Sequence, residues 1–157
     1  MTAACPGGTL VFPTAGGDMA EPIYTATATS SGDGRNGSVR SGDGHIDQDV
    51  KIPASFGGPG GATNPEELFA AAYAVCFHNA LRLVAKDKGM EIGDDSTVDA
   101  AIGIGPDATS FVLNATITAH LPGLDPEQAQ ELLAAAHQIC PYSKATRGNM
   151  PVDLRVA

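Results

Sequence analysis

The sequence predicts an α+β protein, and its 157 residues fit a single domain with a sizeable core. Two segments, 63–89 and 125–139, have the apolar spacing and the end signals of helices. Strand-like alternation is grouped before the first helix, between the two helices and after the second. Because single strands and helices do not alternate along the chain, this grouping favours α+β over a repeated βαβ arrangement.

The first residues differ in composition from the rest of the chain. Residues 1–21 are rich in glycine, proline and threonine and include Cys5. This composition predicts a flexible leader that precedes a folded domain of residues 22–157. Within such a leader we interpret Cys5 as a bystander rather than as an accessory thiol.

Two strands are expected before the first helix. Ile23–Thr29 alternates between apolar and polar residues, and so does His45–Ile52, which predicts a half-exposed strand. Between them lies a segment dense in turn residues, in which Arg35 belongs to the sequence GRNG, typical of a tight turn. The glycine-rich run 53–64 lacks the GK[ST] ending of a phosphate-binding loop, so we interpret it as a spacer.

The first helix has complete signals at both ends. Asn64 can cap it, Pro65 suits its first position, and Glu67 stands where a capping box has a carboxylate. At the other end, Gly89 can adopt the left-handed conformation that ends many helices. The residues between are apolar over most of the circumference, which predicts burial on several sides.

The second half of the chain repeats these signals. Thr97–Ile104 and Ser110–Ala119 alternate and predict a hairpin. The helix over 125–139 begins with an aspartate, a proline and a glutamine at capping-box spacing. The segment 141–148 predicts a short turn, and Val152–Val156 predicts a final strand.

Charge and cysteine content limit the function. The formal net charge is −9 and the nine basic residues are spread thinly, which argues against nucleic-acid binding. No run approaches about 18 apolar residues, so no transmembrane helix is expected. The N-terminus does not resemble a signal peptide, which favours a cytoplasmic, reducing location. There, three cysteines indicate catalysis or redox sensing rather than structural disulfides.

Cys76 lies in the middle of the first helix, on its apolar surface. A buried cysteine can be an inert core residue, because burial raises a thiol pKa. The helix dipole acts only over the first turn, so it does not reach Cys76. A reactive Cys76 therefore requires a cation from elsewhere in the fold. Arg35, carried back on a hairpin, is one candidate, although it can equally be a solvated turn residue.

Cys140 ends the second helix. If the two alanine-rich helices pack closely, Cys76 and Cys140 come within disulfide reach. The sulfenic acid formed by one thiolate could then condense with the other thiol. A zinc site is the alternative, with His137, Cys140 and Cys76 as ligands and water in the fourth position. The absence of tight ligand spacing makes zinc the weaker interpretation.

Several motifs together resemble one family. They are YTATAT with GRNG, GGATNPEELFAAAYAVCF, LPGL and AAHQICPYSKATRGN, in that order from Tyr24 to Ala157. This combination is similar to the organic hydroperoxide resistance proteins, the Ohr branch of the OsmC/Ohr family. The form CPYSKATRGN resembles the Ohr branch rather than the OsmC branch.

The resemblance implies a thiol-dependent peroxidase that reduces alkyl and lipid hydroperoxides to alcohols in the response to oxidative stress. It implies that Cys76 is the peroxidatic cysteine and that Cys140 resolves it through an intrasubunit disulfide. Arg35 would hold the thiolate and Glu66 would orient Arg35. The implied reductant is a lipoylated protein or another dithiol such as dihydrolipoamide, and no metal or bound prosthetic group is implied.

The implied fold consists of two antiparallel sheets around two long central helices, in an intertwined homodimer with two active sites between the subunits. An apolar pocket for the alkyl chain could include Phe69, Tyr73 and Phe77, which could equally be core residues. Arg40, five residues after Arg35, could share its role. An OsmC-type peroxidase with a broader substrate range and a non-enzymatic thiol redox sensor remain alternatives.

Overall fold

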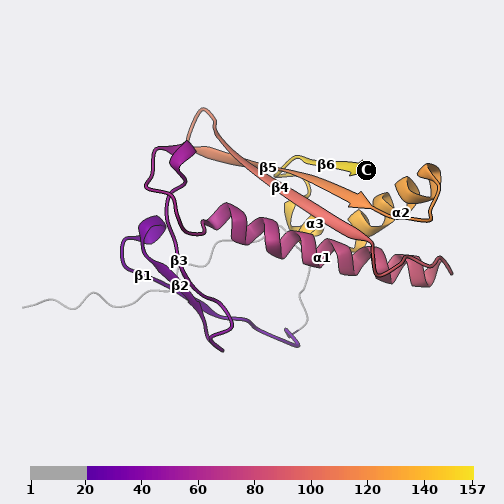
Figure 1. The fold of residues 1–157 in the computed structure, drawn as a ribbon, viewed down its shortest axis with the longest axis horizontal. Helices are drawn as coiled ribbons and strands as arrows, with labels where there is room; N and C mark the ends of the chain where they lie inside the picture. Colours follow the sequence, from indigo (N-terminus) through magenta and orange to yellow (C-terminus); the bar gives the residue numbers. More distant parts are fainter. Residues whose placement is uncertain (1–20) are drawn as a thin grey trace, which may run out of the picture.

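The computed structural model describes residues 21–157 and has two three-stranded sheets with three α-helices (Figure 1). The predicted α+β class is therefore confirmed. The predicted leader, apart from Glu21, and Cys5 lie outside the described residues. The strands are β1 (Ala28–Ser31), β2 (Ser38–Ser41), β3 (Asp47–Asp49), β4 (Thr97–Pro106), β5 (Phe111–His120) and β6 (Val152–Val156). The helices are α1 (Pro65–Asp87), α2 (Pro126–Ile139) and α3 (Pro141–Thr146), with 3₁₀ turns η1 (Gly34–Asn36) and η2 (Ala54–Phe56).

The two sheets differ in strand direction. In the first sheet β1–β2–β3 is antiparallel throughout, and in the second β4 and β5 form the predicted hairpin. β6 pairs with β5 in parallel, which corrects the prediction of two antiparallel sheets for this strand. The reason is the crossover through α2 and α3, since a parallel neighbour needs a connection of this length.

The start and the end of α1 follow the local signals of the sequence. The Glu67 N–H donates to the Asn64 side-chain oxygen at 2.9 Å, and Pro65 occupies the first turn. The Glu67 carboxylate does not complete a capping box and instead accepts from the Thr63 hydroxyl at 3.1 Å. Gly89, with φ of +68°, adopts the left-handed conformation after the helix. In α2 the capping box of Asp125 and Gln128 is complete, as predicted.

α1 runs between the two sheets, with β4 and β5 on one side and β1–β3 on the other (Figure 1). Its inner face, with Tyr73, Phe77 and Leu81, is fully buried in the core with β5 and α2. Its outer face carries Val75 and Leu83, which are 73% and 54% exposed. The predicted burial on several sides is thus met on one side only, and the protomer leaves an apolar helix face uncovered. By length and composition alone, α1 could cross a membrane. The core helices of soluble proteins can have the same length and composition.

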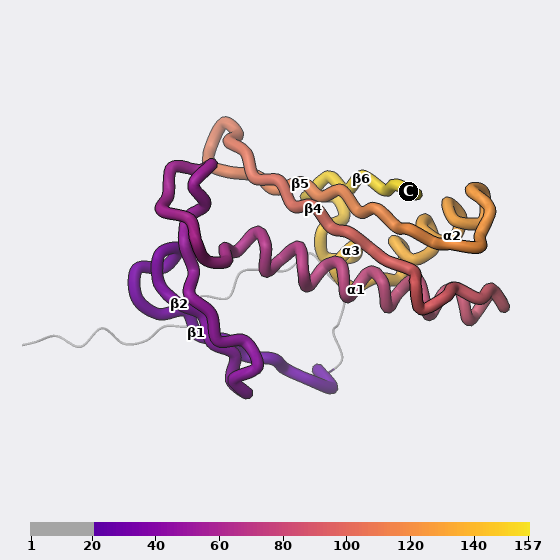
Figure 2. The backbone as a smooth tube through the Cα atoms, in the orientation of Figure 1, coloured from indigo at the N-terminus to yellow at the C-terminus, as the bar shows by residue number. Residues whose placement is uncertain are grey.

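The first sheet stands apart from the core. Within residues 21–157 its strands have extensive contacts only with one another, and Figure 2 shows them extending away from β4, β5 and β6. The predicted strand Ile23–Thr29 begins only at Ala28, because the preceding residues lack a continuous ladder partner. Ile23 and Tyr24 are consequently 105% and 75% exposed.

Three further boundaries differ from the predictions. The strand expected over His45–Ile52 is limited to β3, beyond which Val50 forms a single bridge with Thr63. β2 lies within the segment expected to be only turn, because its ladder with β1 and β3 compensates for a turn-rich composition. The segment after Cys140 is the helix α3 rather than a simple turn.

Candidate active site

Cys76 and Cys140 lie next to each other in the core. Cys76 is on α1, and Cys140 lies between α2 and α3, as the C-cap of α2 and the N-cap of α3. Their Sγ atoms are 3.7 Å apart, so they are neighbouring thiols rather than a disulfide. Small residues allow this approach, because Ala80 on α1 and Ala136 on α2 are both buried where these helices pack. The condition for disulfide reach, close packing of the two helices, is met.

The surroundings of Cys76 oppose ionisation. Burial raises the pKa of the Cys76 thiol, the hydrogen bond from the Tyr142 backbone N–H lowers it, and the adjacent Cys140 raises it again. No cationic side chain of residues 21–157 contributes to this balance. Within residues 21–157 no positive charge therefore offsets the effect of burial on this thiol.

Arg35 and Glu66 form an ion pair. Arg35 lies in η1, and Glu66 lies in the first turn of α1, where the helix dipole favours a carboxylate. The Arg35 Nη2 donates to the Glu66 Oε2, and the two side chains are 38% and 15% exposed. The Arg35 Nε is buried without a partner among the described residues. The guanidinium is thus held firmly at one edge and retains unused hydrogen-bonding capacity.

The ion pair and the cysteine pair are far apart in one protomer. Glu66 precedes Cys76 by ten residues on the same helix. At a rise of 1.5 Å per residue, their backbones are about 15 Å apart along the axis of α1. The chain therefore brings together the members of each pair but separates the two pairs along α1.

Arg40 lies elsewhere. It is on β2, where its guanidinium is 3.6 Å from Asp47 on the neighbouring strand, and the two side chains are 69% and 62% exposed. A solvated pair of this kind contributes little energy. The carboxylate of Glu66 is engaged by Arg35 and not by Arg40.

The predicted aromatic pocket is mostly core. Tyr73 and Phe77 are fully buried, and Phe69 is partly buried beside them. The rings form a cluster, with centroids of Phe69 and Tyr73 5.9 Å apart and those of Tyr73 and Tyr142 5.7 Å apart. Side chains without exposure cannot line an open pocket, so Tyr73 and Phe77 take the alternative role of core residues.

An apolar cavity of about 370 Å³ lies beside Arg35 instead. Its apolar walls come from Val39 of β2, from Val50 after β3 and from Leu68 of α1. Arg35 lines the same cavity. Sequence reasoning missed these three residues. For Val39 the available signal was the GRNG turn: a strand that pairs directly after this turn places Val39 near Arg35.

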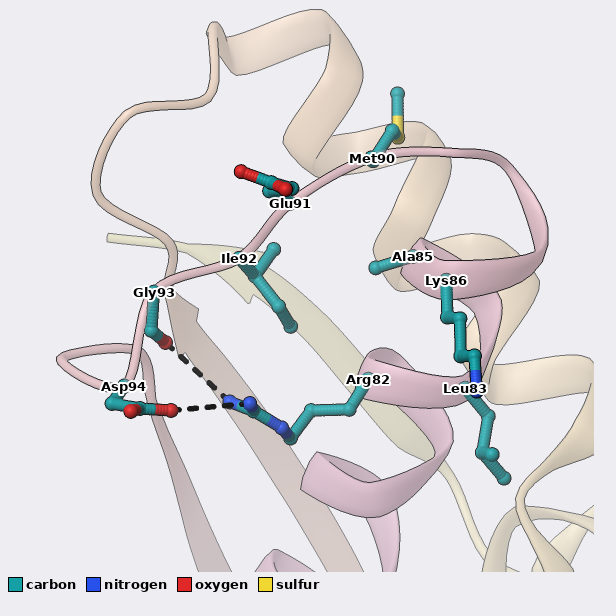
Figure 3. Close-up of a pocket in the computed structure, with 9 residues that line it drawn as sticks. All are labelled: Arg82, Leu83, Ala85, Lys86, Met90, Glu91, Ile92, Gly93 and Asp94. Atoms are coloured by element: carbon teal, nitrogen blue, oxygen red, sulfur yellow. Dashed lines mark hydrogen bonds and ion pairs between the residues drawn. The ribbon is translucent and has the colours of Figure 1, made fainter.

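A larger hollow, of about 730 Å³, lies at the other end of α1 (Figure 3). Figure 3 shows Arg82 directed toward Gly93 and Asp94, and its Nη2 donates to the Asp94 carboxylate at 3.2 Å. Neither cysteine lines this hollow. Size alone therefore does not identify the site, and the cysteine pair remains the candidate reactive centre.

The zinc alternative lacks a ligand set in the described part of the chain. No group of three His, Cys, Asp or Glu side chains among residues 21–157 is arranged to hold a metal ion. His137 instead packs its ring against Phe77, with centroids 6.5 Å apart. Burial lowers the pKa of His137, and the charge of Arg147 lowers it further.

The fold and the site define a two-sheet α+β protein in which a thiol on α1 lies 3.7 Å from a thiol at the junction of α2 and α3. The chain belongs to the OsmC-like protein family, whose model matches residues 58–155, and within it to the organic hydroperoxide resistance branch.

Relatives that are named organic hydroperoxide resistance proteins match over almost their full lengths. The organic hydroperoxide resistance protein of Xanthomonas axonopodis pv. citri is 42% identical over 143 residues, which cover 88% of this chain and all of that one. The crystal structure of OhrB of Bacillus subtilis matches with a TM-score of 0.79 at 44% identity, over 87% of this chain and 100% of that one. An organic hydroperoxide resistance protein from Legionella pneumophila matches with a TM-score of 0.82 at 41% identity, over 87% and 99%.

Proposed function

We propose that this protein is a thiol-dependent peroxidase that reduces organic hydroperoxides to alcohols. Its relatives support a role in organic hydroperoxide resistance. The observation that carries the proposal is the 3.7 Å separation of the Cys76 and Cys140 sulfur atoms. Two thiols at this distance can store both oxidising equivalents of a peroxide as one disulfide.

The reaction proceeds in three steps. The Cys76 thiolate attacks the distal oxygen of the hydroperoxide, the O–O bond breaks, and the alkoxide takes a proton to leave as the alcohol. Cys76 is then a sulfenic acid, and the Cys140 sulfur attacks it to form the disulfide with loss of water. An external dithiol, which we propose to be a lipoylated protein or a small dithiol such as dihydrolipoamide, returns both cysteines to thiols by exchange.

The working unit is proposed to be a homodimer with two active sites between its subunits. In one protomer, α1 leaves Val75 and Leu83 exposed and the first sheet has no extensive packing partner among residues 21–157. Because about 15 Å of α1 separates Glu66 from Cys76 within a chain, we propose the partner subunit as the source of the cation. In this arrangement Arg35 and Glu66 of one subunit complete the cysteine pair of the other.

The substrate class follows from the cavity beside Arg35. If Arg35 reaches the partner subunit's thiolate, the cavity lined by Val39, Val50 and Leu68 adjoins that thiolate, because Arg35 lines the same cavity. An apolar cavity stabilises an alkyl chain by removing it from water, a gain that hydrogen peroxide does not have. We therefore propose alkyl and lipid hydroperoxides as substrates and the reducing cytoplasm as the place of action.

Turnover with dihydrolipoamide tests the function. The reduced protein should consume an alkyl hydroperoxide through many cycles, and much faster than hydrogen peroxide at equal concentration. Consumption is followed by loss of dihydrolipoamide and formation of the alcohol. A protein that oxidises once and cannot be recycled by any dithiol is a redox sensor. Equal rates with both peroxides would favour the broader, OsmC-type range.

The cavity makes a separate prediction. Leu68→Asn should raise the KM for a long-chain alkyl hydroperoxide by about tenfold, because an amide in an apolar wall loses the burial energy of the leucine side chain. The rate with hydrogen peroxide should stay the same. Steady-state kinetics with both substrates measure the difference. Val112→Asn, a similar change at an exposed position of β5, is the control and should alter neither.

A further inference from the structure

A cluster of three buried hydroxyl groups joins α1 to α3. The Tyr73 hydroxyl lies 2.9 Å from the Ser143 Oγ and 3.4 Å from the Thr146 Oγ1. Tyr73 and Ser143 are fully buried, and Thr146 is 7% exposed. The Thr146 hydroxyl also donates to the Ser143 carbonyl at 3.1 Å. The cluster is therefore internally bonded, as polar groups in a core must be.

This cluster lies one helical turn from both reactive thiols. Tyr73 precedes Cys76 by three residues on α1, and Ser143 follows Cys140 by three residues on α3. The hydrogen bond thus connects the segment that carries one sulfur atom to the segment that carries the other.

Apolar packing by itself would not fix this geometry. The rings of Phe69, Tyr73 and Tyr142 stack in the same region, and such contacts tolerate sliding and rotation. A hydrogen bond is directional and operates over a narrow range of distances. In a six-residue helix such as α3, one bond of this kind can determine how its N-cap residue, Cys140, faces α1.

We propose that Tyr73 and Ser143 are positioning residues for the resolving thiol. The inference rests on the proposed peroxidase function and concerns its second step, in which the Cys140 sulfur attacks the Cys76 sulfenic acid and water leaves. The Tyr73–Ser143 hydrogen bond holds α3 so that the Cys140 sulfur stays within reach. The first step depends on Cys76 and a delivered cation, so it does not require this bond.

Rapid-mixing experiments on the full chain separate the two steps. Tyr73→Phe and Ser143→Ala should each slow disulfide closure by about tenfold, the equivalent of one buried hydrogen bond. Sulfenate formation by an alkyl hydroperoxide should change by less than about threefold. The sulfenate is trapped with dimedone and the disulfide is followed by intact mass. The double variant should be no slower than Tyr73→Phe alone, because that variant already removes the hydroxyl that bonds Ser143.

Ser96→Ala is the matched control. The Ser96 hydroxyl is also buried and bonded, lying 3.0 Å from the His78 Nε2 and donating to the Gly93 carbonyl at 2.7 Å, toward the other end of α1. Its loss should lower stability to a similar extent without changing disulfide closure. Equal slowing by Ser96→Ala would show a general structural effect and would overturn the positioning role.

A measurement without peroxide distinguishes this proposal from the peroxidase function. The equilibrium between thiols and disulfide is measured in buffers of reduced and oxidised dithiothreitol. Tyr73→Phe should shift it about tenfold toward the thiols, because Cys140 is held less well beside Cys76. A shift in a protein that does not react with hydroperoxides would support positioning and refute the peroxidase. An unchanged equilibrium and unchanged closure in a reactive protein would refute positioning alone.

Discussion

Cys76→Ser is expected to abolish the reduction of alkyl hydroperoxides, whereas Cys140→Ser should permit one oxidation per chain and then stop. The serine hydroxyl is not ionised at neutral pH and cannot attack the O–O bond. In Cys140→Ser the first step survives, but no thiol lies 3.7 Å away to capture the sulfenic acid. The alcohol formed per chain, measured with and without dihydrolipoamide, distinguishes the two variants.

Cys5→Ser is the matched control for this prediction. The same exchange in the predicted leader should leave both the single turnover and the recycling unchanged. Retained turnover in Cys76→Ser would place the reactive thiol elsewhere. Full recycling in Cys140→Ser would mean that the external dithiol attacks the sulfenic acid directly, so that an internal disulfide is not needed.

Arg35→Ala should slow the reaction of Cys76 at neutral pH by about a hundredfold or more. Burial raises the pKa of the Cys76 thiol, and a guanidinium close to the sulfur lowers the pKa of a thiol because it favours the charged form. Without Arg35 the thiolate fraction falls. Since the thiolate increases as pH rises through the thiol pKa, the rate of the variant should recover in part at alkaline pH. Stopped-flow oxidation across a pH series measures both effects.

Arg40→Ala is the control for Arg35→Ala. Arg40 lies five residues along the same hairpin, and its exposed pair with Asp47 should not affect the thiol. A normal rate in Arg35→Ala together with a slow rate in Arg40→Ala would exchange the roles of the two arginines. Glu66→Gln should have an intermediate effect, because it leaves the guanidinium in place without the carboxylate that holds it.

Mixed dimers show which subunit provides the arginine. Arg35→Ala and Cys76→Ser chains, each nearly inactive alone, are co-expressed with different tags and the mixed dimer is purified. If Arg35 acts across the interface, one of the two sites combines a native Cys76 with a native Arg35 and regains its rate. If Arg35 acts within its own chain, both sites stay inactive. The result separates shared sites from independent ones without a new structure.

Local residue chemistry determined the helices. Asn64 caps α1 through the N–H of Glu67, and Asp125 with Gln128 closes the capping box of α2, as their spacing predicts. Signals of this kind act between residues a few positions apart, so they can be read from the sequence alone. The motifs around Cys76 and Cys140 likewise predicted the family, because they lie on these well-defined elements.

Only the tertiary structure decided the pairing of distant segments. It made β6 parallel to β5, delayed the start of the first predicted strand to Ala28, and placed Cys140 beside Cys76 across 64 residues of sequence. It also buried Tyr73 and Phe77 in the core and left an apolar cavity beside Arg35. Which apolar side chains become core and which line a cavity depends on what packs against them. The segments that pack against a side chain come from distant parts of the sequence, so the spacing of nearby residues does not specify them.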